Sequence, residues 1–363
     1  MNQPIVSLMP NTYMGLAQGP FEWSEIDWLR ELGDNVYYAL WLGLPSQVNK
    51  DLPLGHRLYV ISFHLEPMDA AWLQRQFGLI NAPIIVINDG EFYDFPVPDN
   101  VHFYTYYGWQ HQIDQIVEWF PDRQPRQVTH KISGLCNRIT QSKLIVFTAL
   151  MEHLGEPECL VKLSEWLEEK NVHFREPCGI EVLDDLSDIF YEKYFGQTYK
   201  VDEFNNAKDN VQRINSNPWN PFYLNAALHF TNESYHYSLM SDGAKSFVRP
   251  GPHLSEKTLK CLVAGTPFIS VGQFRTYANL RKLGLEFDYG IDLAWDEDPG
   301  NLSRLVGIVN MIKTLADYTK EDLVEMTQAS TDHNTDMIWS GEFQRCARAH
   351  NEIIREQILK EFR

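Results

Sequence analysis

The chain has 363 residues, which corresponds to about two domains at roughly 150 residues each. Hydrophobic residues make up 44% and charged residues 22%, which is typical of a folded protein and excludes wholesale disorder. Against 31 Lys and Arg residues stand 49 Asp and Glu residues, so the net charge is −18. Because phosphate contacts dominate affinity for nucleic acids, this charge argues against sequence-blind binding to a duplex.

The N-terminal residues lack the basic and apolar regions of a signal peptide. No run of about 18 apolar residues predicts a membrane-spanning helix. The five cysteines form no CxxC pair, which is typical of free thiols in a reducing compartment. We therefore expect a cytoplasmic protein without a membrane span.

Residues 1–130 are predicted to form a first domain, in which strands alternate with helices. This spacing implies a parallel sheet with helices on its faces, and therefore an α/β fold. One lysine and five arginines stand against fifteen acidic residues here, so a polyphosphate ligand is expected in the rest of the chain. The predicted elements are strands at Leu58–Phe63, Pro83–Asn88 and Val101–Tyr107, and helices at Asp69–Phe77 and Gln112–Phe120.

Ionisable residues follow two of these strands. His64 and Glu66 come after the first strand, and Asp89 and Glu91 come after the second. Ligands bind beyond the carboxyl ends of parallel strands, so a catalytic base is expected among them. Glu66, held by the following proline, ranks first, Asp89 second and His64 third. The alternative for each is an ordinary polar loop position.

Residues 131–340 are predicted to form a second domain, after a linker at Pro121–Gln127. Within it, residues 155–220 are polar and rich in asparagine, and no domain boundary is predicted inside this stretch. A long amphipathic helix is predicted over residues 341–363. The other predicted elements are strands at 129–135, Ala226–Phe230 and Pro267–Val271, and helices at Gln141–His153, Ser255–Ala264, Thr276–Leu283 and Leu302–Leu315.

The stretch Pro252–Gly272 carries the strongest chemical signal. Ser255 is typical of a helix N-cap, which places Glu256 and Lys257 in the first turn. A helix N-terminus attracts phosphate, and Lys257 adds a full positive charge there. Glu256 can accept hydrogen bonds from ribose hydroxyls. The pattern therefore suits a nucleoside diphosphate, and the alternative is a plain capped surface helix.

Residues 253–272, HLSEKTLKCLVAGTPFISVG, resemble the donor-binding motif of fucosyltransferase-like (family 10-like) glycosyltransferases of bacteria and phages. Residues 230–234, FTNES, are similar to the Phe-Glu-Asn-Ser segment of these enzymes. Asn137-Arg138, followed by Lys143, resembles the segment whose cations meet the donor phosphates. Residues 277–292 resemble the continuation of the motif in related enzymes.

The resemblance implies the GT-B architecture, in which two Rossmann-like domains face each other across a cleft. In that architecture a C-terminal helix, here residues 341–363, often packs back on the first domain. The implied reaction transfers a sugar from a UDP- or GDP-linked donor to an acceptor hydroxyl without a metal or another cofactor. Glu256 would hold the ribose and Lys257 the pyrophosphate. The full implied donor site comprises Ser255, Glu256, Lys257, Arg138, Lys143, Asn232 and Ser234.

A glycan is the expected acceptor, because an aromatic and acidic first domain suits a sugar. One alternative is a hydroxylated base in DNA, bound by a basic patch of Arg123, Arg126, His130 and Lys131. Another is a non-catalytic protein that binds a nucleotide sugar or a carbohydrate. Residues 296–298 match the Asp-x-Asp pattern of a metal-binding glycosyltransferase fold, but we interpret them as a solvated acidic loop, so no metal site is expected.

Overall fold

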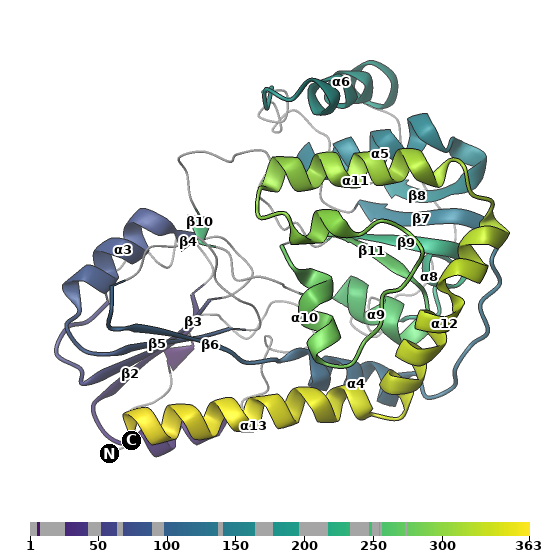
Figure 1. Ribbon diagram of the computed structural model, residues 1–363. Coiled ribbons are helices and arrows are strands. Elements are labelled where there is room, and N and C mark those ends of the chain that lie inside the picture. The colour runs from purple at the N-terminus through teal and green to yellow at the C-terminus, as the bar shows by residue number, and fades with distance from the viewer. Residues whose placement is uncertain are drawn as a thin grey trace, which may run out of the picture. The chain divides into compact units, whose positions relative to one another are not determined.

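The computed structural model shows two compact units, each built on a sheet of parallel strands (Figure 1). The first unit takes its residues from 1–114, 243–253 and 342–363, and the second from 115–242 and 254–341. The predicted α/β class with parallel sheets is confirmed. The residues that the structure describes are 6–7, 26–42, 52–63, 68–88, 98–136, 141–163, 177–195, 217–232, 247–248, 254, 256–272 and 274–363.

The described part of the first unit has a parallel sheet in the strand order β1-β2-β3-β5-β6. Val, Ile and Tyr dominate these segments, and the described side chains of the central strands, at 58–61 and 84–87, are all buried, which is typical of strands covered on both faces. The last strand ends at Thr105, two residues before its predicted end at Tyr107. The backbone N–H of Tyr107 instead donates to Asn351 Oδ1 at 2.8 Å, and Asn351 Nδ2 donates to the carbonyl oxygen of Tyr107 at 2.6 Å. The strands are β1 (Val6–Ser7), β2 (Val36–Leu42), β3 (Leu58–Phe63), β5 (Ile84–Asn88) and β6 (Val101–Thr105).

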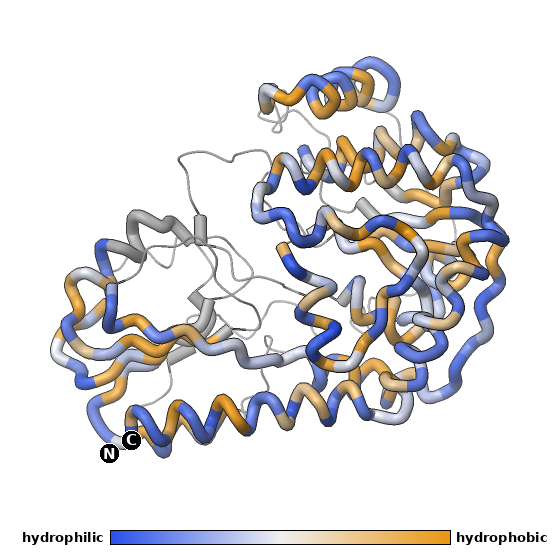
Figure 2. Tube along the Cα trace, in the orientation of Figure 1, coloured by the Kyte–Doolittle hydropathy of each residue, from blue (hydrophilic) through white to orange (hydrophobic). Residues whose placement is uncertain are grey.

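One face of this sheet is covered by η1 (Asp27–Leu32) and by the end of α13 (Glu342–Phe362). Apolar and polar residues alternate along α13 (Figure 2), and its Ile358 is fully buried with Val60 of the sheet. Arg57 Nη1 donates to the carbonyl oxygen of Phe362 at 3.0 Å. The unit also holds α3 (Ala70–Leu79), the start of α4 (Trp109–Trp119), and an antiparallel pair of β4 (Met68–Asp69) and β10 (Phe247–Val248).

The second unit has a parallel sheet in the order β11-β9-β7-β8. After β7 the chain forms β8 on one side of β7, and it then crosses back to form β9 on the other side. The boundary between β7 and β9 is therefore a topological switch point, the place where open α/β sheets bind ligands. The strands are β7 (His130–Cys136), β8 (Cys159–Leu163), β9 (Ala226–Asn232) and β11 (Phe268–Val271).

Helices cover both faces of this second sheet (Figure 1). One face carries α5 (Gln141–His153) and α11 (Asn301–Leu315), and the other carries α8 (Pro221–Leu224), α9 (Glu256–Ala264) and α12 (Lys320–Trp339). Gly265 ends α9 with a φ of +66°, and a Cβ there would lie 2.7 Å from Thr335 Oγ1 of α12, so only glycine fits. The remaining elements are α6 (Glu181–Ile189), α10 (Thr276–Lys282), η2 (Glu156–Glu158), η4 (Phe190–Tyr194) and η6 (Ala294–Glu297).

Candidate functional site

The carboxyl edge of the second sheet is the candidate site. The strands end there at a common level, because Val271 of β11 pairs with Asn232 of β9 and Cys136 of β7 pairs with Leu163 of β8. Two helices also begin at this edge. The chain enters α5 soon after β7 ends, and α9 begins between β9 and β11. The edge therefore combines the switch point with two helix N-termini.

Lys143 lies in the first turn of α5, and it is only 8% exposed. Burial follows from the helix itself, whose residues from Gln141 to Met151 are all buried. A positive charge in the first turn opposes the helix dipole, so it does not serve the stability of the helix. A buried ammonium at this position is suited to an anion at the carboxyl edge.

Lys257 is the second residue of α9 and is partly buried. Burial, together with the positive charges of Lys260 and Lys257, lowers the pKa of His229 in the middle of β9 to about 3. Lys257 therefore lies within electrostatic range of the central strand. The structure brings Lys143 and Lys257 to the same edge of the sheet, from opposite sides of the switch point.

The other expected site residues are described in part or not at all. Glu256 begins α9 and Asn232 ends β9, which places both backbones at the carboxyl edge. The remaining expected residues lie outside the described part of the chain, and their roles stay predictions. These are Ser255, Arg138 and Ser234 of the donor site, and Glu66, Asp89, His64 and Glu91 among the candidates for the base.

A buried polar pair links the two central strands behind this edge. His229 is fully buried, and its Nδ1 lies 2.7 Å from Ser133 Oγ on β7. Ser133 Oγ donates to the carbonyl oxygen of Phe222, so the serine accepts from the histidine. This fixes the neutral tautomer with the proton on Nδ1. The pair holds β7 and β9 in register next to the switch point.

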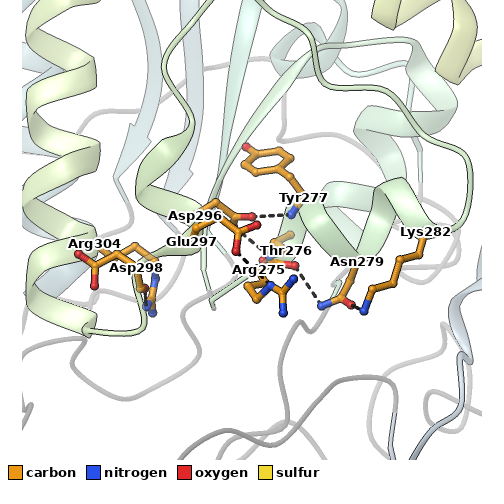
Figure 3. Close-up of polar contacts among 9 residues, drawn as sticks. All are labelled: Arg275, Thr276, Tyr277, Asn279, Lys282, Asp296, Glu297, Asp298 and Arg304. Atoms are coloured by element: carbon orange, nitrogen blue, oxygen red, sulfur yellow. Dashed lines mark hydrogen bonds and ion pairs between the residues drawn. The ribbon is translucent and has the colours of Figure 1, made fainter.

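The expectation of a solvated acidic loop is wrong for Asp296, which is 2% exposed. Its two carboxylate oxygens accept from the backbone N–H groups of Thr276 and Tyr277, at 2.9 and 3.0 Å, so they cap α10 (Figure 3). Burial raises the pKa of Asp296 to about 6, although these hydrogen bonds act in the opposite direction. Because the carboxylate of Asp296 already binds the first amides of α10, these amides are not open to another anion.

Arg275, which precedes α10, has a φ of +59°. A left-handed conformation at a residue other than glycine persists only where the surroundings hold it. Its N–H donates to the backbone oxygen of Asp296 at 2.8 Å, and its Nε pairs with Glu297 at 3.1 Å (Figure 3). Arg304, 2% exposed, binds the carbonyl oxygens of Gly272 and Asp298. The chain after β11 is therefore fixed from two sides.

Two of the four cations of the expected DNA-binding patch donate to backbone carbonyl oxygens of the second unit. Lys131 is 5% exposed, and its Nζ donates to the carbonyl oxygen of Ala316 at 3.4 Å. The Arg126 guanidinium donates to two carbonyl oxygens at the start of β9, at 2.6 and 3.1 Å. Burial lowers the pKa of Arg126 to about 10. Both side chains are engaged within the second unit, which disfavours the expected patch.

Among the described residues, no group of three or more His, Cys, Asp or Glu side chains is arranged to hold a metal ion. A helix that could span a membrane is not found in the described part of the chain. Comparisons with models of protein families, with curated proteins and with solved structures gave no match.

Proposed function

We propose that this protein is a metal-independent glycosyltransferase of GT-B architecture, which transfers a sugar from a UDP- or GDP-linked donor to a hydroxyl of a glycan. One observation carries the proposal. Lys143 and Lys257 lie in the first turns of two helices, at the carboxyl edge of a parallel sheet, on either side of its switch point. Anions and nucleotides bind at such edges.

The proposed chemistry places the donor diphosphate between these two helix starts. Negative charge develops on the diphosphate as the glycosidic bond breaks, and fixed positive groups stabilise it. Lys143, Lys257 and Arg138 supply these charges, and Glu256 holds the donor ribose. A base from the first unit, with Glu66 ranked before Asp89 and His64, removes the proton of the acceptor hydroxyl. This role for the base belongs to the inverting form of the reaction.

Replacing either lysine with methionine is expected to weaken binding of the nucleotide sugar ten- to a hundred-fold. Loss of a charge-assisted hydrogen bond costs about 1.5–3 kcal/mol, and methionine preserves the buried length of the chain. Calorimetric titration of the Lys143→Met and Lys257→Met variants with UDP- and GDP-sugars measures the effect. Lys313→Met, on the exposed side of α11 in the same unit, is the matched control. Equal affinity in all three variants would contradict the proposed donor site.

Release of UDP or GDP from the donor is expected to continue in the presence of EDTA, because lysines and helix amides neutralise the diphosphate. The assay measures the free nucleotide over time, with and without a panel of glycans. Loss of release with EDTA and its recovery with Mn²⁺ would contradict a metal-independent reaction. Donor binding without any release would instead identify a non-catalytic nucleotide-sugar-binding protein. We do not propose DNA as the acceptor, because Arg126 and Lys131 are engaged within the second unit.

A further inference from the structure

The first unit contains a pocket of about 740 Å³, and all of its described lining residues belong to this unit. Its walls come from η1, from α13 and from the chain that follows β6. The volume lies in the range of about 300–1,000 Å³ that small-molecule sites occupy. Tyr106 follows the carboxyl end of β6, whereas η1 and α13 cover one face of the sheet, so most of the described lining comes from elements on that face.

The floor of the pocket is aromatic and rigid. Trp28 is 9% exposed and Tyr106 is 4% exposed, and their ring centroids lie 6.2 Å apart. The indole Nε1 of Trp28 donates to the Tyr106 hydroxyl at 3.4 Å. Asn351, also part of the lining, is held by two hydrogen bonds to the backbone of Tyr107. The floor is therefore ordered before any ligand binds.

The rim consists of paired charges. Arg355 contacts Glu31 at 2.9 Å and Glu352 at 2.7 Å, and Arg30 pairs with Asp27. Arg348, which also lines the pocket, pairs with Asp114. Among the described lining residues three are arginines and three carry carboxylates, so their formal charges sum to zero. Hydrogen bonding to Glu31 raises the pKa of Arg355, which keeps the guanidinium charged.

This combination favours one class of ligand. A net charge of zero offers no attraction to a phosphate or a carboxylate, whereas fixed guanidinium donors and carboxylate acceptors match hydroxyl groups that both donate and accept. Aromatic side chains beside such groups suit the mixed polar and apolar faces of a sugar ring. We propose that this pocket binds a neutral saccharide. The inference goes beyond the transfer reaction, because none of the residues assigned to the donor or to the base is among the described lining residues of the pocket.

The indole N–H of Trp28 provides a direct probe of the pocket. In ¹H–¹⁵N spectra of the full chain its signal is assigned by its loss in the Trp28→Phe variant. Titration with neutral mono- and disaccharides of glucose, galactose, mannose, fucose and N-acetylglucosamine is expected to shift this signal. The donor is left out, so the result does not depend on the lysine site of the second unit. If no neutral saccharide shifts the signal, the proposal is wrong.

Two variants of opposite charge separate a neutral sugar from an anion. Arg355→Gln and Glu352→Gln are each expected to weaken saccharide binding at least five-fold, because each replaces a charged hydrogen-bonding group of the rim with a neutral amide that makes weaker hydrogen bonds. Lys360→Gln, on an exposed part of the same helix, is expected to leave binding unchanged. A pocket for anions would respond differently: hexuronates or sugar phosphates would shift the Trp28 signal, Arg355→Gln would weaken their binding and Glu352→Gln would strengthen it. That pattern would overturn the assignment to a neutral saccharide.

Discussion

Replacing Asp296 with alanine is expected to lower the free energy of unfolding of the second unit by about 2–3 kcal/mol. The change removes the cap of α10 and leaves the amides of Thr276 and Tyr277 without their acceptor. These residues are 1% and 0% exposed, so water cannot easily replace the carboxylate. Loss of a cap costs about 0.5–2 kcal/mol, and each unsatisfied buried donor about 1–3 kcal/mol. The burial cost that raises the pKa of Asp296 offsets part of this loss.

Hydrogen exchange followed by mass spectrometry measures this effect within the unit. We expect peptides that contain the start of α10 to exchange faster in Asp296→Ala than in the original protein. Glu297→Ala is the matched control, because Glu297 is an exposed neighbour that pairs with Arg275 at the surface. Exposed ion pairs contribute about 0–1 kcal/mol. Similar exchange in the two variants would show that Asp296 is not the cap.

Between pH 6.5 and 4.5, protonation of His229 in the unfolded state is expected to lower the free energy of unfolding by about 2–3 kcal/mol. Replacing His229 with asparagine is expected to abolish this loss. The pKa of His229 is about 3 in the folded protein and about 6.5 in an unfolded chain. The unfolded state therefore binds the proton more tightly, so stability is complete above pH 6.5 and is lost as the pH falls toward 3. An asparagine Nδ2 can still donate to Ser133, but it does not titrate.

Denaturant midpoints of both proteins at pH 7.5 and 4.5 measure this difference. Asp296 acts in the opposite direction, because its pKa is raised in the folded state and proton uptake there increases stability as the pH falls through 6. The original protein should therefore change only modestly between these conditions. His229→Asn should then be relatively more stable at pH 4.5 than at pH 7.5. If both proteins lose the same stability on acidification, His229 does not titrate as inferred.

Sequence patterns predicted several of the elements whose buried faces are apolar. The bounds of β3 and α5 were predicted to the residue, and β2, with the sequence VYYALWL, carries the same signal and could have been predicted. In contrast, α12 was not predicted, because its buried face is polar. Thr327, Thr331 and Thr335 of this helix are buried and donate to carbonyl oxygens four residues earlier. Hydroxyls satisfied in this way pack like small apolar groups, which hydrophobic periodicity does not detect.

For the candidate site too, the sequence predicted local features and missed contacts between distant residues. The motif around Lys257 and the start of α5 led to the carboxyl edge of the second sheet, because the relevant groups lie near helix starts. The role of Asp296 was missed because the cap lies 20 residues from the amide that it accepts. The only local signal is that Arg275, a poor N-cap residue, stands before α10. The pocket of the first unit joins η1 to α13, so its balanced charge appears only in three dimensions.

The contribution of α13 to the first unit has a consequence for the order of events at the ribosome. Domains generally fold as they are synthesised, beginning with the one nearest the N-terminus. Here residues 342–363 are translated after the whole of the second unit, yet they carry Ile358 and Phe362 of the first unit's core. The second unit can finish folding while the first still exposes one face of its sheet. A premature stop codon just after Gly341 would therefore harm the unit that was translated first.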